Sequence, residues 1–326
     1  MEHEFYRGGA LRDEVRTRAR VKAVLGTDVP RRWNRTTIDL RHQLKAGACT
    51  VWCMRVLARA GVKRHVLDAL APVLFHIEAL VYVGDFEYEN AQTEGTAVDP
   101  RWREGIEEIL RAYQLDDRGI VSALARLVDY LELETDILAG RTPLHPDLIP
   151  RTCYIRCSGI NMLVRIGFRL AGIQPDEEFF ALLGQLSAHD EISTDLASYE
   201  EDLEDGAFNV YRLANWIYGP QAAEHHLRRH GDDMLRALRR DIANADRKTL
   251  TLFAAALPPI VPFSPQLPSI VPKLLPRAPL ARLVDLRLHY HSTSKPLRFP
   301  EPVPDTAPAA SRQVRATDAA LSGRSR

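Results

Sequence analysis

Four small side chains that carry oxygen recur at every fourth position of one stretch of the chain. They are Asp190, Thr194, Ser198 and Asp202. In an α-helix, residues four apart lie on the same face, so a helix here presents a row of oxygen atoms. Hard divalent cations such as Mg²⁺ take oxygen ligands, keep several waters and accept phosphate oxygens as further ligands. The row therefore predicts half of a site for metal ions and a diphosphate.

This stretch resembles the second metal-binding motif of class I terpene cyclases. That motif runs Asn-Asp-Leu-x-Ser-Tyr-x-x-Glu and continues to a Gly and then Asn-x-Val. The positions that fit the pattern are Asp195, Leu196, Ser198, Tyr199, Asp202, Gly206, Asn209 and Val210. The chief departure is Thr194, where the family has Asn or Asp, because a hydroxyl binds Mg²⁺ more weakly than a carboxylate or amide oxygen. Asp202 is a shorter carboxylate than the family's Glu.

An ordinary explanation of the same stretch is a solvated acidic helix. Glu200, Glu201, Glu204 and Asp205 follow the row and carry further negative charge. Charged runs of this kind commonly form the exposed face of a helix. The extended match to the cyclase motif favours the metal site over this alternative.

The resemblance implies a second, aspartate-rich motif at the end of a very apolar helix upstream. Residues 73–83 form an apolar run, and Gly84-Asp-Phe-Glu-Tyr-Glu-Asn90 follows it. Asp85 and Glu89 match the first and fifth positions of the Asp-Asp-x-x-Asp motif and lie one helical turn apart. Phe86 replaces the second Asp. Alone, this cluster is equally typical of a solvated helix end.

An arginine that grips the diphosphate is the next element that the resemblance implies. Arg156 is the first choice, because Gly159 follows it closely, as in the family's broken helix, although the spacing is one residue short. Arg151 is the alternative, and a surface arginine is the ordinary explanation. Tyr199, inside the second motif, is the further diphosphate contact that the resemblance implies.

A third phosphate-binding element of the family, an Arg-Tyr pair near the C-terminus, is not found. The nearest candidates are Arg282 and the Arg287–Tyr290 stretch, which follow a proline-rich run. The ending of the chain therefore departs from the family pattern.

The chemistry of the family explains why it needs two acidic clusters. A diphosphate leaves an allylic carbon only when its developing negative charge is neutralised, and the family uses Mg²⁺, as three ions with the diphosphate, for that purpose. Asp85 and Arg156 are the residues expected to act most directly at this step. The cation left behind needs an apolar pocket without water. The aromatic candidates for its lining, each of which also fits an ordinary core, are Trp52, Phe75, Tyr82 and Phe86.

The four cysteines form two pairs with the spacing Cys-x-x-x-Cys. These pairs are Cys49 with Cys53 and Cys153 with Cys157. Such a pair on each of two helices is compatible with a shared zinc or iron–sulfur site, but neither pair has the Gly- or Pro-containing turn of a zinc knuckle. Free Cys is commonly a small core residue. We favour a structural role.

The bulk composition of the 326 residues predicts a soluble cytoplasmic protein. Lys and Arg number 43, as do Asp and Glu, and 45% of the residues are hydrophobic. The balanced charge gives no support for nucleic-acid binding. No uninterrupted apolar run reaches the roughly 18 residues of a membrane span, and the N-terminus lacks a signal pattern.

Helical periodicity extends over most of the chain and predicts an all-α fold. Helices are expected within the block 50–83, broken near Gly61 and eased at Pro72, and over 101–114, 118–139, 151–171, 177–204, 207–217, 220–229 and 231–257. Thirteen of the 21 prolines lie between Pro258 and Pro308, and only 281–291 there is expected to be a short helix.

These patterns divide the chain into four parts. We expect an N-terminal helical extension (1–39), a terpenoid-synthase-like domain (40–257), a proline-rich segment (258–299) and a disordered tail (300–326). The expected fold is the class I terpenoid-synthase helical bundle with a central cavity.

The sequence favours a terpene cyclase that ionises a linear prenyl diphosphate, with farnesyl diphosphate as the expected substrate. Its metal ligands are expected to be Asp85, Glu89, Thr194, Ser198 and Asp202. Whether the chain forms a homodimer stays open. The main alternative is a protein of the same fold without catalysis, which binds prenyl diphosphates or acts as an interaction protein. A chain-elongating prenyltransferase and a cysteine-ligated metal protein are weaker alternatives.

Overall fold

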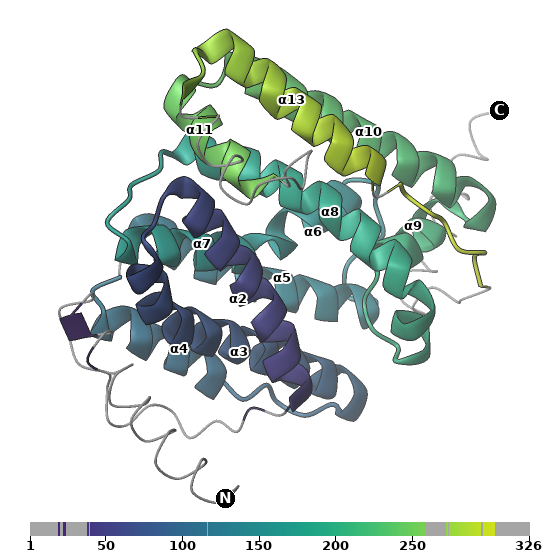
Figure 1. Ribbon diagram of the computed structural model, residues 1–326. Helices are drawn as coiled ribbons and strands as arrows, with labels where there is room; N and C mark the ends of the chain where they lie inside the picture. Colours follow the sequence, from purple (N-terminus) through teal and green to yellow (C-terminus); the bar gives the residue numbers. More distant parts are fainter. Residues whose placement is uncertain are drawn as a thin grey trace, which may run out of the picture.

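The computed structural model describes residues 38–257 and 272–303, apart from residues 39, 116, 273 and 295, together with residues 19, 22 and 23. Within this part every regular element is an α-helix, and no strand occurs (Figure 1). The prediction of an all-α fold is thereby confirmed. Most of the expected N-terminal extension and the end of the tail lie outside the described residues.

From α2 to α11 the helices follow one another with short connections. They are α2 (Leu40–Ala60), α3 (Arg64–Glu94), α4 (Arg101–Ala112), α5 (Arg118–Leu138), α6 (Leu148–Arg156), α7 (Ser158–Leu170), α8 (Glu177–Glu204), α9 (Val210–Tyr218), α10 (Pro220–Asn244), α11 (Arg247–Ala256) and α13 (Arg277–Ser294).

Turn signals in the sequence located several helix ends well. The predicted helix 177–204 coincides with α8, which begins after the capping Asp176, whose carboxylate accepts from the Phe179 amide at 3.0 Å. Gly61, with φ of 104°, separates α2 from α3 as expected. Pro72 lies inside α3 without ending it.

Two predicted helix boundaries are wrong. The expected helix 151–171 breaks at Cys157 into α6 and α7. The expected break before Gly231 does not occur, because α10 runs through it and the chain turns at Ala245 and Asp246 instead. Gly231 is buried, and a Cβ added there would lie 3.3 Å from a methyl carbon of Leu297. This glycine therefore serves close packing rather than a turn.

The C-terminal part is more ordered than expected. The predicted short helix 281–291 is the longer α13, which lies beside α10 (Figure 1). Residues 300–303 belong to the folded body rather than to a tail. Pro300 accepts a hydrogen bond from the Tyr211 hydroxyl at 3.3 Å, and the Val303 amide donates to the Tyr199 hydroxyl at 3.3 Å.

Helix α7 packs against α2, α3, α5 and α8 and so joins the two helices that carry the acidic motifs. Around it, one apolar cluster fills the space among α2–α5, α7 and α11, and a second lies among α6, the end of α8, α9 and α10. Each fully buried Leu or Phe in these clusters contributes about 1.5–3 kcal/mol. The two clusters hold the C-terminal ends of α3 and α8 in fixed positions.

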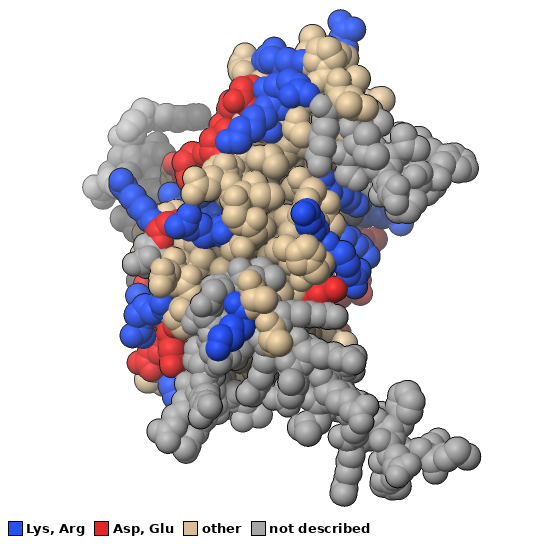
Figure 2. Space-filling model, turned by 60° about the vertical axis from the view of Figure 1, so that its left-hand side comes forward, with Lys and Arg blue, Asp and Glu red and all other residues tan. Residues whose placement is uncertain are grey.

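Helix α3 is also apolar enough to be a membrane span by length and composition. The most apolar stretch within Arg64–Gln92 has a mean hydropathy of 1.8. In the folded protein, 61% of that stretch is buried. A core helix of a globular protein meets the same criterion, so the expected absence of a membrane span stays a prediction. On the face in Figure 2, basic and acidic side chains are interspersed around an uncharged centre.

Gly84 sets the position of the aspartate-rich motif. A Cβ added at Gly84 would lie 2.5 Å from Cδ2 of Trp102, whose ring is 2% exposed. We expect Gly84→Ala to lower the free energy of unfolding by about 1–3 kcal/mol in chemical denaturation, because the buried ring must move. The control is Gly47→Ala on α2, where the nearest atom lies at 3.8 Å. That change should stabilise by about 0.5–1 kcal/mol, and equal behaviour of the two variants would contradict the packing argument.

Candidate functional site

The two predicted acidic motifs lie on the C-terminal halves of α3 and α8. The charges around one motif act on the residues around the other. Asp85 and Glu89 are half-buried on α3. Burial raises the pKa of Glu191 on α8, and the positive charge of Arg156 opposes this rise. The negative charges of Asp195, Asp190 and Asp85 raise the pKa further. The carboxylate of Asp85 thus lies within electrostatic reach of α8.

The row on α8 forms a connected set of hydrogen bonds. The exposed Thr194 donates its hydroxyl to the Asp190 carbonyl oxygen at 3.2 Å. Ser198 donates to Oδ2 of Asp202 at 2.6 Å, and Asn209 donates its side-chain amide to the same oxygen at 2.7 Å. Asn209 also caps α9, accepting from the Tyr211 amide at 2.9 Å. The asparagine of the motif therefore holds the carboxylate of Asp202 in place.

Asp190 differs from the other three members of the row. Both of its carboxylate oxygens lie 2.9 Å from Nε2 of His291, which α13 contributes. This contact turns Asp190 toward α13. The predicted ligands Thr194, Ser198 and Asp202 remain together on their face of α8.

Arg156 is the centre of the polar interior. Its Nη1 donates to Oδ1 of Asp195 at 2.6 Å, and its Nε lies 3.1 Å from Glu191. Its guanidinium carbon lies 5.9 Å from the ring centre of Tyr130. Burial alone would lower the pKa of Arg156, but Asp195 and the other acidic neighbours hold it well above its ordinary value. The second oxygen of Asp195 accepts from the Val210 amide at 2.6 Å, so this carboxylate links Arg156 to the start of α9.

The structure distinguishes between the two predicted arginines. Helix α6 ends at Arg156, and α7 begins at Ser158, so the break at Cys157 lies beside Arg156. Gly159 follows in the first turn of α7 and is buried against Leu127 and Val81. Arg151, one and a half turns earlier, is exposed. Only Arg156 meets the acidic residues of α8.

Tyr199 does not share the face of the predicted ligands. It is 1% exposed, and its ring lies 5.1 Å from that of Tyr211. Its hydroxyl accepts from the backbone of Val303. This placement makes Tyr199 an anchor for the C-terminal segment, and we remove it from the set of diphosphate contacts.

Glu134 on α5 is a member of the site that the sequence analysis missed. It is 6% exposed, and burial raises its pKa to about 8, with added effects of the charges of Asp85 and Glu89. A hydrogen bond from Tyr130 and the charge of Arg156 oppose that rise. Glu134 follows Leu127 and Leu131 at helical spacing. A carboxylate on such an apolar face was the signal that could have revealed it.

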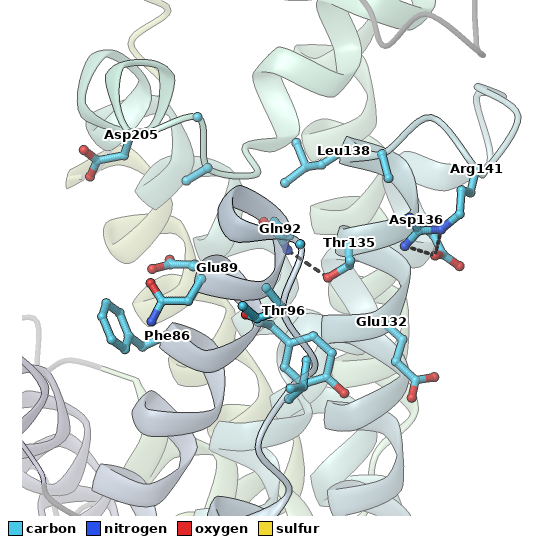
Figure 3. Close-up of a pocket in the computed structure, with 18 of the residues that line it drawn as sticks. Phe86, Glu89, Gln92, Thr96, Glu132, Thr135, Asp136, Leu138, Arg141 and Asp205 are labelled. Carbon is cyan, nitrogen blue, oxygen red and sulfur yellow. Dashed lines mark hydrogen bonds and ion pairs between the residues drawn. The ribbon is translucent and has the colours of Figure 1, made fainter.

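A cavity with a volume of about 1040 Å³ opens beside the aspartate-rich motif (Figure 3). Glu89 and Phe86 reach it from α3, Thr135 from α5, and Asp205 from the turn after α8. Gln92 donates to the Thr135 hydroxyl at 2.8 Å across the cavity wall. This cavity therefore connects the ends of both acidic helices.

A second cavity, of about 420 Å³, lies among α2, α7, α8, α11 and α13. Trp52, Ile160 and Leu186 form much of its apolar wall, while Asp190 and His291 contribute its polar side. Of the four predicted aromatic lining residues, Trp52 lines this cavity and Phe86 the larger one. Tyr82 instead contacts the thiol of Cys49 at 3.3 Å, and Phe75 lies beside Gly47.

The donors on α3 and α8 fit Mg²⁺ in chemical type, since they are carboxylate and hydroxyl oxygens. Among the described residues, however, no three His, Cys, Asp or Glu side chains form a group that could hold a metal ion. A cation at either motif would therefore complete its coordination with water and phosphate oxygens, as Mg²⁺ commonly does. The four cysteines are free, and Cys53 and Cys157 point their thiols at backbone carbonyls of Leu163 and Cys153.

Comparison of the chain with family models, with curated proteins and with solved structures finds no match.

Proposed function

We propose that this chain is a class I terpene cyclase on the terpenoid-synthase bundle, which ionises a linear prenyl diphosphate, with farnesyl diphosphate as the first candidate. The observation that carries the proposal is the polar centre around Arg156. There, the arginine lies against Asp195 and Glu191 of α8, and the negative charge of Asp85 of α3 adds to the raised pKa of Glu191. A cation–diphosphate group needs acidic ligands on two sides and an arginine between them.

Each residue has a defined task in this proposal. Asp85 and Glu89 on α3, with Thr194, Ser198 and Asp202 on α8, would hold the metal ions, and Mg²⁺ when bound supplies Lewis acidity toward the leaving diphosphate. Arg156 would bind diphosphate oxygens. Its guanidinium already contacts Asp195 and Glu191 through Nη1 and Nε, so diphosphate oxygens would bind to its other N–H groups or replace one of these contacts. The walls of Trp52, Ile160 and Leu186 would exclude water from the cation.

The test is turnover of prenyl diphosphates of three chain lengths by the purified chain with Mg²⁺, read as released diphosphate and extracted terpene. Asp85→Asn and Asp202→Asn should each lower diphosphate release by at least about 100-fold, because each removes a carboxylate that would hold the Mg²⁺ needed to neutralise the leaving group. The matched control is Glu87→Gln, in the same acidic run, which should retain activity. Absence of turnover with every chain length would overturn the enzymatic proposal.

A second candidate is a catalytically silent protein of this fold that binds prenyl diphosphates or acts as an interaction protein. Two observations favour it: Thr194 replaces the family's amide or carboxylate, and Arg156 is engaged by two carboxylates. Calorimetry with a non-hydrolysable prenyl diphosphate analogue distinguishes the two. Binding without turnover of the corresponding diphosphate would favour the silent protein.

A further inference from the structure

The smaller cavity carries a histidine–aspartate pair on its wall. His291 comes from α13 and Asp190 from α8, and both line the 420 Å³ cavity opposite Trp52, Ile160 and Leu186. Nε2 of His291 lies 2.9 Å from each oxygen of Asp190, and His291 is 8% exposed. A buried imidazole beside an apolar cavity is thus fixed in orientation by one carboxylate.

This contact defines which nitrogen of the ring is available as a base. A carboxylate accepts hydrogen bonds, so the Nε2 of His291 that faces Asp190 carries a hydrogen. In the neutral ring, Nδ1 then holds a lone pair and accepts protons. Asp190 would also stabilise the imidazolium that forms, as the carboxylate of a catalytic triad does for its histidine.

Besides Asp190, the other polar groups on this wall are a carboxylate paired with Arg156, arginine side chains, a protonated thiol and hydroxyls. Glu191 lies 3.1 Å from Arg156, and Arg59 donates to the backbone oxygens of Ala255 and Leu257. Burial raises the pKa of the Cys49 thiol to about 12, so this group stays protonated. The remaining groups that face the cavity are the Arg55 side chain and the hydroxyls of Ser187, Tyr290 and Ser294; His189 lies near Asp190, its Nδ1 3.7 Å from Oδ1.

The His291–Asp190 pair also lies at a suitable distance from the predicted metal ligands along α8. Asp190 precedes Thr194 by one helical turn and Asp202 by twelve residues, which is about 18 Å along a helix. A prenyl chain that extends from the predicted ligands back along α8 would reach the cavity with His291.

We propose that His291, oriented by Asp190, is the base that ends the reaction, and this inference rests on the proposed function. A C–H bond next to the cationic carbon breaks, its electron pair forms a C=C bond, and the proton moves to Nδ1 of His291. The resulting imidazolium beside Asp190 later returns the proton to solvent. The product class that follows is a cyclic hydrocarbon formed by proton loss, rather than an alcohol formed by water capture.

His291→Gln tests this role, because the glutamine amide retains a hydrogen-bond donor toward Asp190 but is not a base. With farnesyl diphosphate and Mg²⁺, we expect diphosphate release within about threefold of the unmodified chain, while the share of the original hydrocarbon falls at least about tenfold. Alcohols or other hydrocarbons should replace it in gas chromatography. His289→Gln, the same change at an exposed position of α13 outside the cavity lining, is the control and should leave the product unchanged.

The outcomes separate this inference from the function on which it rests. No diphosphate release from the unmodified chain would overturn the proposed function. Release with an unchanged product distribution in a folded His291→Gln variant would overturn only the role of His291. Independently of turnover, ¹⁵N NMR at pH 8 should show a hydrogen on Nε2 of His291, which faces Asp190, and a hydrogen on Nδ1 would contradict the proposal.

Discussion

Replacement of Arg156 by methionine is expected to lower the free energy of unfolding by about 3–5 kcal/mol, because it leaves buried carboxylates without their cation. Asp195 has a side chain that is 1% exposed and lies 2.6 Å from Arg156. Glu191 is 27% exposed and lies 3.1 Å away. Methionine fills a similar volume but supplies neither charge nor hydrogen bonds. Chemical denaturation at pH 7 measures the loss.

Two further variants show that the loss comes from the ion pairs. Arg151→Met, on the exposed side of the same helix, should change stability by no more than about 0.5 kcal/mol. Adding Asp195→Asn to Arg156→Met should restore part of the loss, since the unpaired buried charge is then removed. A loss below about 1 kcal/mol in Arg156→Met would show that Arg156 behaves as a surface residue.

The same contacts explain how much of the site the sequence could predict. Arg156 was preferred to Arg151 because of the glycine that follows it, and the structure places that glycine in the first turn of α7, after the break at Cys157. The spacing of Thr194, Ser198 and Asp202 was enough to place them on one face, because it depends only on helix geometry. The activity and the metal ions stay predictions.

What the sequence could not supply are contacts between distant parts of the chain. His291 lies 101 residues after Asp190, and no local pattern indicates that α13 brings the two together. The proline-rich run suggested a rebuilt ending, yet α13 follows it and lines a cavity. The helix expected to end at residue 229 continues through Gly231, whose close contact with Leu297 is a tertiary feature. Local sequence patterns therefore predicted helix faces and helix ends, while tertiary packing determined which helices lie in contact.

Glu78 on α3 gives the clearest expected pH effect. Its side chain lies two helical turns before Asp85, the residue is 4% exposed, and Oε2 has no hydrogen-bond partner among the described residues. Burial raises its pKa to about 7 from the ordinary value of 4.5, although a hydrogen bond with Cys49 acts in the opposite direction. The folded chain therefore retains a proton here that the unfolded chain has lost.

Glu78→Gln is accordingly expected to stabilise the chain by about 3 kcal/mol at pH 8, since each pKa unit corresponds to about 1.4 kcal/mol. The sign follows from proton binding: between about pH 4.5 and 7 the folded state binds more protons than the unfolded state, so stability falls as pH rises. At pH 4, where both states are protonated, the variant and the original chain should differ little.

Denaturation curves at pH 4, 6 and 8 measure this difference directly. Comparing the variant with the original chain at each pH removes the contribution of Glu134, whose raised pKa acts in the same direction. Glu200→Gln, on the exposed side of α8, is the matched control and should change stability by no more than about 0.5 kcal/mol at any pH. A Glu78→Gln variant that is less stable than the original chain at pH 8 would show that the ionised carboxylate has a stabilising partner in the folded protein. A stabilised variant would show that α3 carries a buried carboxyl group whose ionisation no partner compensates, so that this residue lowers the stability of the fold.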